Sequence, residues 1–362
     1  MKKFISILIF IFSLLTIIGC SGSPEIINKN TEIEIKKNLG ELVIYSGRKE
    51  SLVGPIIKLF SDSTGTEVKV KYGASAALAA LLMEEGDKSP ADIFYAQDPG
   101  AIGSVEKMLQ PINKSIFTKT SITVNGKTET SALVPDWAKS RSNLWIGITG
   151  RARVVVYNTI KLTESDLPDT IMGFCDPKWK GQIGWAPSNS SFQTMITAMR
   201  LALGEEETKQ WIECIRDNKA IIYPGNAPQV QAVAKGEIDI GFVNHYYLYK
   251  FKLDKNEGEQ FNVSNYHPRG AGPGSLMMVS AAGILKTSKN EKNAEKFIDF
   301  LLSELTQEYF SNVTREYPLV EGIKIHPLLT SLEKIGNSGI ILSELQDIVG
   351  STKLLTDAGV LD

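Results

Sequence analysis

Two adjacent tyrosines, Tyr246 and Tyr247, follow an apolar run at residues 238–243 that is typical of a buried strand. Within a strand, neighbouring side chains point to opposite faces, so the two phenols would diverge. Beyond the strand, in a turn or a first helical turn, successive side chains differ by only about 100°. Both phenol oxygens can then converge on one centre at the carboxyl end of the strand.

Such a pair has a specific chemistry. A phenol has a pKa near 10, so two tyrosinates at one point need a strong Lewis acid to remove their protons. Hard anionic oxygens suit a hard, highly charged cation, and ferric iron fits that description better than softer divalent metals. The alternative is structural, an aromatic pair that lines a cleft or fills a core, and the tyrosines alone leave both interpretations open.

A second polar cluster lies at the start of an expected helix, residues 187–204, and consists of Ser188, Asn189, Ser190 and Ser191. These residue types are preferred at helix N-caps, and the free backbone N–H groups of a helix start can bind an anion. Plain helix capping without a ligand explains the same residues.

The elements that position these groups follow an alternating order. We expect strands at 41–46, 67–72 and 91–96, with helices at 50–65 and 75–86 between them. This order predicts a parallel sheet with right-handed crossovers, whose ligands bind at the carboxyl ends of the strands. Those ends carry Ser46 to Lys49, Gly73 to Ser75, and Gln97 with Asp98.

The second half repeats this arrangement in outline, with strands expected at 182–186, 220–224 and 238–243 and helices at 187–204 and 227–236. Two sets of polar strand ends predict an α/β protein with two lobes, a hinge and a ligand cleft between them, as in periplasmic binding proteins of type II. About 320 folded residues also exceed one comfortable core. The expected lobes are 41–150 with about 275–325, and 151–274 with about 326–362.

The first 20 residues predict export. Lys2 and Lys3 precede an apolar run from Phe4 to Ile18, and the small residue Gly19 precedes Cys20. We interpret residues 1–19 as a signal peptide, because the run is too short for a good membrane span. The junction is similar to the bacterial lipobox, which predicts lipidation of Cys20 and a lipid anchor with a polar tether over residues 20–40. Ordinary signal cleavage near a cysteine is the alternative.

Composition narrows the function further. Without Lys2 and Lys3, the 39 basic residues fall to 37 against 41 acidic ones, a net charge of −4 that argues against a nucleic-acid partner. No hydrolase, P-loop, zinc-protease or dinucleotide-binding motif occurs, so we expect a monomeric binding protein rather than an enzyme. Spacing does not decide whether Cys175 and Cys214 form a disulfide.

Five motifs carry a family resemblance: YSGRKE, GDKSPADIFYAQDPGA, GRARVVVYNT, DPKWKGQIGWAPSNSSFQ and VNHYYLY. In this order they resemble the periplasmic ferric iron-binding proteins, the bacterial transferrins of iron ABC transporters, over about residues 41–320. The resemblance implies Fe(III) as cargo, ligated by Tyr246 and Tyr247, and delivery to a permease and an ATPase. It also implies a synergistic phosphate or carbonate, held by Ser188, Asn189, Ser190, Ser191, Asn226 and Asn244.

The chain departs from the family pattern at two positions. Lys49 falls where the best-known members have a histidine ligand, and Gln97 where they have a glutamate. A protonated lysine cannot ligate iron, and a glutamine is a neutral, weaker donor. We expect Gln97 and Asp98 as the remaining metal donors, with Tyr45 or a second anion oxygen as alternatives.

Basic residues near these positions would balance the charge of the anion, and the candidates are Arg48, Lys49 and Arg151. Arg151 and Arg153 fall at the expected hinge, where bracing of the lobe interface is the competing role. The altered metal shell leaves a second cargo class open on the same fold, a small solute such as a phosphonate, a polyamine or thiamine.

Overall fold

The computed structural model describes residues 40–121, 129–255, 258, 260–270, 272–336 and 338–361. Residues 37–362 form one compact unit, and the description below concerns that unit. The predicted signal peptide, Cys20 and the tether up to residue 39 lie outside the described residues. Within the described part of the chain, no helix is long and apolar enough to cross a membrane.

The first sheet begins with three parallel strands, β1 (Glu41–Ser46), β2 (Glu67–Tyr72) and β3 (Ile93–Ala96), as predicted. The strand order is β2-β1-β3-β12-β7, so β12 (Met277–Leu285) returns antiparallel between β3 and β7 (Trp145–Asn158). Two short strands border this sheet, β4 (Leu109–Gln110) and β13 (Tyr317–Pro318). A separate hairpin pairs β5 (Thr118–Ser121) with β6 (Glu129–Ala132).

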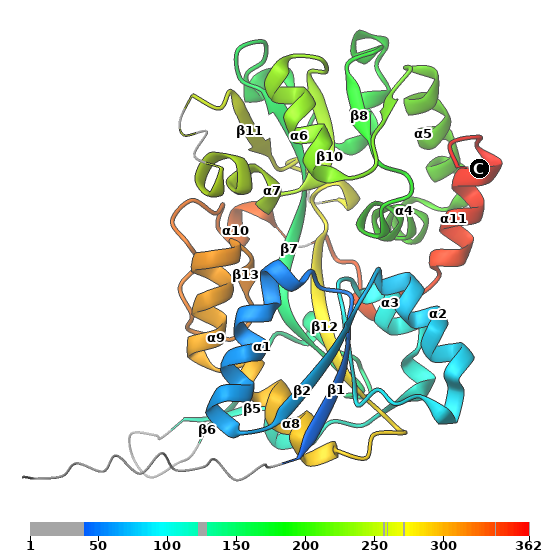
Figure 1. The fold of residues 1–362 in the computed structure, drawn as a ribbon. Coiled ribbons are helices and arrows are strands. Elements are labelled where there is room, and N and C mark those ends of the chain that lie inside the picture. Colours follow the sequence, from blue (N-terminus) through cyan, green and yellow to red (C-terminus); the bar gives the residue numbers. More distant parts are fainter. Residues whose placement is uncertain are drawn as a thin grey trace, which may run out of the picture. The chain divides into compact units, whose positions relative to one another are not determined.

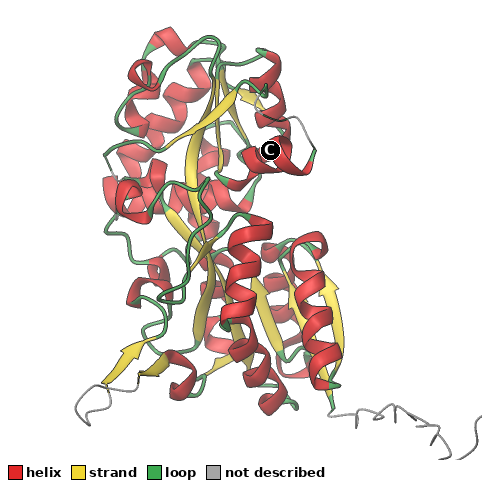
Figure 2. Ribbon diagram, turned by 90° about the vertical axis from the view of Figure 1, so that its left-hand side faces the viewer, coloured by secondary structure: helices red, strands yellow, loops and turns green. Residues whose placement is uncertain are grey.

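Helices cover this sheet on both sides (Figure 2). Helix α1 (Glu50–Thr64) buries Leu52, Val53, Ile56, Ile57 and Phe60, which recur at helical spacing, and it ends at Gly65 in the left-handed conformation, φ 73°. The other helices of this half are α2 (Ser75–Glu85), α3 (Pro99–Ser104), α8 (Glu291–Leu301) and α9 (Glu304–Tyr309).

The second sheet is built around the other end of β7. Strand β10 (Ile240–Asn244) pairs antiparallel with β7 and parallel with β8 (Ile183–Trp185), which in turn pairs with β9 (Ile221–Ile222). Strand β11 (Val263–Tyr266) pairs with β7 from the other side. The helices of this half are α4 (Ser190–Leu203), α5 (Glu205–Asp217), α6 (Asn226–Lys235) and α7 (Tyr246–Tyr249).

Strands β7 and β12 connect the two halves (Figure 1). All 14 residues of β7 are buried; the part before Arg153 pairs with β12, and the part from Arg153 onward pairs with β10. Each half has its own buried apolar clusters, one around Phe60 and Trp145 and others around Trp211 and Val230. The predicted α/β fold with two lobes joined by hinge strands is therefore confirmed.

The chain after residue 326 contacts both lobes. Ile335 of α10 (Leu332–Ile335) and Leu329 pack in a cluster of the second lobe, whereas Leu342 and Leu345 pack in the core of the first. Helix α11 (Ile348–Asp357) then packs against α4, with a 2.8 Å hydrogen bond between the hydroxyls of Ser351 and Thr197. This tail does not follow one lobe throughout.

Candidate metal and anion site

The strand ends of the first lobe contact one another closely. The backbone N–H of Gln97 donates to Ser75 Oγ at 2.9 Å, and that of Gly47 donates to the Tyr95 carbonyl at 2.8 Å. A β-carbon at Gly47 would lie only 1.9 Å from Ser75 Oγ, so this approach requires glycine. Three loops that are distant in sequence thus form one polar surface, as expected for parallel strand ends.

A cleft of about 600 Å³ lies between this surface and the start of α4. The predicted site residues that line it are Arg48, Lys49, Gln97, Ser188, Asn189 and Ser190. Ser75, from an expected strand end, lines it as well, together with Glu50, Tyr72 and Gln193, which the sequence did not point to. Polar groups from both lobes therefore face one cavity.

Helix α4 starts without a side-chain cap. The side chain of its N-cap residue, Asn189, makes no hydrogen bond to the helix, so it leaves the helix start open. Instead, Asn189 Oδ1 accepts from Asn226 Nδ2 at 3.5 Å. This arrangement argues against plain capping as the explanation of the serine-rich segment and leaves backbone donors at the cleft.

The remaining predicted anion residues form a buried network behind the helix start. Arg153 Nη1 donates to Asn244 Oδ1 at 3.1 Å and to Asn226 Oδ1 at 3.5 Å. Asn244 Nδ2 donates to Ser191 Oγ at 3.3 Å. Burial lowers the pKa of Arg153 to about 9, because the guanidinium has exchanged water for only these amide oxygens. The network fixes the asparagines that the resemblance assigns to the anion.

Tyr246 and Tyr247 open helix α7, which one residue, His245, separates from the end of β10, and this matches the expected position beyond the strand. Their rings stack with centroids 4.5 Å apart and an interplanar angle of 28°, and their exposed fractions are 2% and 8%. Burial, and then the neighbouring Tyr247, raises the pKa of the Tyr246 phenol above its ordinary value, while Arg151 and Arg48 oppose the shift. In this state Tyr246 is a neutral phenol at neutral pH.

Three buried guanidiniums surround the tyrosine pair, those of Arg48, Arg151 and Arg153, each at most 1% exposed. In the described part of the chain, all three side-chain nitrogens of Arg151 lack a hydrogen-bond partner, as do two nitrogens each of Arg48 and Arg153. Unpaired buried charge of this kind is costly and calls for a counter-ion. Of the three, Arg48 lines the cleft, where a bound anion would supply one.

One carboxylate, Glu316, partly compensates these charges. It forms an ion pair with Arg48 and accepts a 2.7 Å hydrogen bond from Thr149 Oγ1. Burial alone would raise the pKa of Glu316, but the guanidiniums of Arg48 and Arg151 outweigh it and lower the pKa. Three guanidiniums and one carboxylate leave the cluster with two uncompensated positive charges.

Two of the predicted metal ligands, Asp98 and Tyr45, make other contacts in this structure. Asp98 Oδ1 caps α3 by accepting from the Ala101 N–H at 2.9 Å, and it accepts from Thr194 Oγ1 of the other lobe at 3.4 Å. Only its buried Oδ2 lacks a partner among the described residues. Tyr45, the alternative donor, gives its hydroxyl to Glu85 Oε1 at 2.8 Å and does not line the cleft. Gln97 is therefore the predicted metal ligand of the first lobe that lines the cleft.

His245, next to the pair, is not free to ligate a metal. Its Nδ1 accepts from the Ala152 N–H at 3.1 Å, so Nε2 carries the proton and donates to the Arg315 carbonyl at 2.7 Å. Burial lowers the pKa of His245 to about 4, which keeps the ring neutral. Across the residues described, no group of three or more His, Cys, Asp and Glu side chains could hold a metal. Of the predicted metal ligands, Tyr246, Tyr247 and Gln97 remain as candidates.

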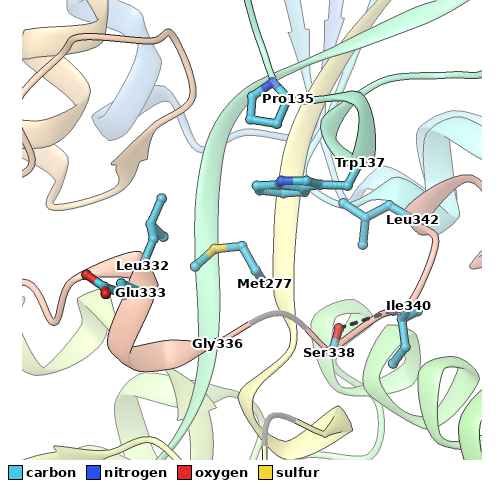
Figure 3. Close-up of a pocket in the computed structure, with 9 residues that line it drawn as sticks. All are labelled: Pro135, Trp137, Met277, Leu332, Glu333, Gly336, Ser338, Ile340 and Leu342. Carbon is cyan, nitrogen blue, oxygen red and sulfur yellow. Dashed lines mark hydrogen bonds between the residues drawn. The ribbon is translucent and has the colours of Figure 1, made fainter.

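A separate cavity of about 410 Å³ lies next to Met277 of β12 (Figure 3). Its lining is largely apolar and includes Pro135, Trp137, Leu332 and Ile340. It contains none of the predicted site residues and no cluster of charged groups. Its chemistry does not suit an ion, so the interlobe cleft is the candidate site.

Sequence reasoning missed two parts of the site. Glu316 lies 268 residues after Arg48 and carries no local motif, so nothing in the sequence linked the two. Arg153 was noted only as a residue near the hinge, although its position opposite Asn244 in the β7–β10 ladder places it behind the anion residues. Alternation along β7 was the available signal for Arg151 and Arg153, since residues two apart share one face of a strand.

Comparisons with known proteins agree with this geometry. A family model for bacterial extracellular solute-binding proteins matches residues 88–331. A major ferric iron-binding protein from Neisseria meningitidis serogroup B is 33% identical over 333 residues, covering 89% of this chain and 94% of that protein. An Fe(3+)-binding periplasmic protein from Serratia marcescens is 29% identical and covers 88% of this chain and 90% of its own length.

Solved structures show the same similarity. Iron-bound HitA from Pseudomonas aeruginosa superposes with a TM-score of 0.80 at 30% identity, over 88% of this chain and 99% of the other. The Trichodesmium protein IdiA (FutA), in complex with iron and citrate, superposes with a TM-score of 0.73 at 29% identity, again over 88% and 99%.

Proposed function

The chain belongs to the bacterial extracellular solute-binding proteins, and on that premise we propose that it is the Fe(III)-binding subunit of an ABC iron importer. It captures ferric iron in the cleft between its lobes, closes around it and delivers it to a permease and ATPase. The protein is exported, and a lipid anchor on Cys20 keeps it at the cell membrane, in the periplasm or on the outer face of the membrane. Binding, not catalysis, is its activity.

The observation that carries this proposal is the stacked tyrosine pair among buried guanidiniums. Tyr246 and Tyr247 bring two phenol rings together, with centroids 4.5 Å apart, and both oxygens become anionic donors when a strong Lewis acid displaces their protons. Arg48 and Arg151 act electrostatically on Tyr246 and favour its charged form. The site is thus arranged to hold negative charge against a highly charged cation.

A synergistic anion completes the site in this proposal. The open start of α4 at Ser190 offers backbone N–H groups, and Arg151 offers three nitrogens that have no partner among the described residues. Gln97 adds a neutral donor from the first lobe, and Lys49 adds a positive charge at the rim. Phosphate, carbonate and the citrate named with the Trichodesmium protein all fit a cationic cleft of about 600 Å³.

The test uses the protein from residue 21 onward, stripped of metal and given ferric citrate with phosphate or with bicarbonate. We expect a phenolate-to-iron charge-transfer band in the visible spectrum that fades in both Tyr246→Phe and Tyr247→Phe. Tyr249→Phe is the matched control, since this third tyrosine of α7 gives its hydroxyl to the Leu328 carbonyl at 2.6 Å. A colourless wild-type protein would refute iron binding and point to an organic anion such as a phosphonate in the same cleft.

A further inference from the structure

Among the described residues, Glu316 supplies the carboxylate of the guanidinium cluster through its ion pair with Arg48. The side chain is completely buried, as is that of its partner Arg48. Its second oxygen accepts from Thr149, whose hydroxyl also shares a 2.7 Å hydrogen bond with Ser280. Glu316 is therefore fixed by β7 and β12, the two strands that connect the lobes.

The same residue is tied to the tyrosine pair from the other side. Its neighbour Arg315 accepts the His245 hydrogen bond, and the ring of its other neighbour, Tyr317, lies 4.9 Å from the His245 ring. Glu316, Arg48 and Arg151 all act on the Tyr246 phenol, the carboxylate with the opposite sign to the guanidiniums. The segment 315–317 thus joins the first loop of one lobe to the phenols of the other.

We infer that Glu316 is a specificity-determining residue of the cleft. It holds Arg48, which lines the cleft, in place, and it sets the net positive charge of the cluster that acts on the bound anion. With Glu316 charged, the cluster has two uncompensated charges; without it, the cluster has three. Because an added positive charge attracts a doubly charged anion more strongly than a singly charged one, Glu316 limits the preference for highly charged anions. This inference rests on the proposed function.

The test measures the ratio of the affinities for two anions. A general loss of structure would weaken the binding of both anions and would not change this ratio as a charge effect does. Iron-free protein is titrated calorimetrically at pH 8 with inorganic phosphate, about two negative charges, and with bicarbonate, one. In Glu316→Gln, we expect the ratio of phosphate to bicarbonate affinity to rise by a factor on the order of ten over wild type. Asp62→Asn changes net charge equally on the exposed face of α1 and should leave the ratio unchanged.

A second variant separates charge from architecture. Arg48→Gln/Glu316→Gln removes both charges of the pair, so the cluster returns to two uncompensated charges and the affinity ratio should return to the wild-type value. A purely structural ion pair predicts instead that the double variant is at least as perturbed as the single one. An unchanged ratio in Glu316→Gln, a double variant that matches the single variant, or a wild type that binds neither anion would overturn the inference.

The charge-transfer band distinguishes the two proposals. With iron and phosphate present, the band should move in Glu316→Gln and return in the double variant, because the charge near the phenolate changes and is then restored. A wild type without the band refutes the iron proposal, whereas the phosphate and bicarbonate titrations of iron-free protein still decide the role of Glu316. A band that is identical in all three proteins contradicts an electrostatic role for Glu316.

Discussion

Iron binding should weaken steeply as the pH falls, because two buried phenols must release protons to become ligands. Burial holds the pKa of Tyr246 above the usual value near 10, so the iron-free protein keeps this proton throughout pH 6–8. Each proton released on binding changes the binding free energy by about 1.4 kcal/mol per pH unit. Two tyrosinate ligands therefore contribute about a hundredfold loss of affinity for each unit of acidification.

The assay isolates this contribution by comparing slopes. Apparent affinity for ferric citrate is measured at several pH values between 6 and 8, with the visible band as the signal. Citrate and the synergistic anion also exchange protons, but they do so equally in every variant. Tyr246→Phe and Tyr247→Phe should each reduce the slope of log affinity against pH by about one, and Tyr249→Phe should not.

Direct proton counting covers variants that bind too weakly for a titration. Loading concentrated protein with a stoichiometric amount of iron in a weakly buffered indicator solution gives the number of protons released per iron. Wild type should release about two more than a variant lacking both phenols. Equal release by wild type and by Tyr246→Phe would show that this phenol is not a tyrosinate ligand, and the site would need another explanation.

Three further predictions concern the scaffold. Replacing Cys175 and Cys214, which the structure joins in a disulfide between residues 39 apart, should lower the free energy of unfolding by about 4 kcal/mol, measured by denaturant titration. Gly47→Ala should lower the free energy of unfolding by about 1–3 kcal/mol and weaken iron binding, because the new methyl group displaces Ser75. A crystal structure of this variant with unmoved strand-end loops would contradict the prediction. Burial, with a smaller effect of the nearby His245, lowers the pKa of His267 to about 4. The unfolded state therefore binds the proton first as the pH falls below 6.5, and this destabilises the folded state. Between pH 6.5 and 4, the free energy of unfolding of iron-free protein should fall by up to about 3 kcal/mol, and that of His267→Gln should fall by less.

Local patterns predicted most of the scaffold. Strands β1 and β2 have the expected bounds. A continuous apolar run predicts β1, and the alternation of apolar and charged residues predicts β2, so the sequence leaves little choice of register. Helix α1 ends at Thr64, directly before Gly65, as helices commonly do at a glycine. The position of Tyr246 at the start of α7 also followed from local sequence, since a strand cannot aim two neighbouring side chains at one point.

What the sequence could not predict depends on contacts between distant segments. Asp98 sits at the carboxyl end of β3, as a ligand would, yet one of its oxygens caps α3 and contacts Thr194. The pairing of Arg48 with Glu316 joins the first and last quarters of the chain, and no periodicity reports such a contact. Whether Cys175 and Cys214 meet likewise depended on the path of α5, which brings their Cα atoms to 5.5 Å.

The place of β12 in the first sheet has a consequence for how the chain acquires its structure. Residues 277–285 fill the gap between β3 and β7, so this sheet has no central strand until more than three quarters of the chain has been synthesised. Until then, β3 and β7 both expose unpaired edges, which delays stable folding and favours pairing with other chains. A polypeptide shortened before residue 277 should therefore aggregate rather than yield an isolated first lobe.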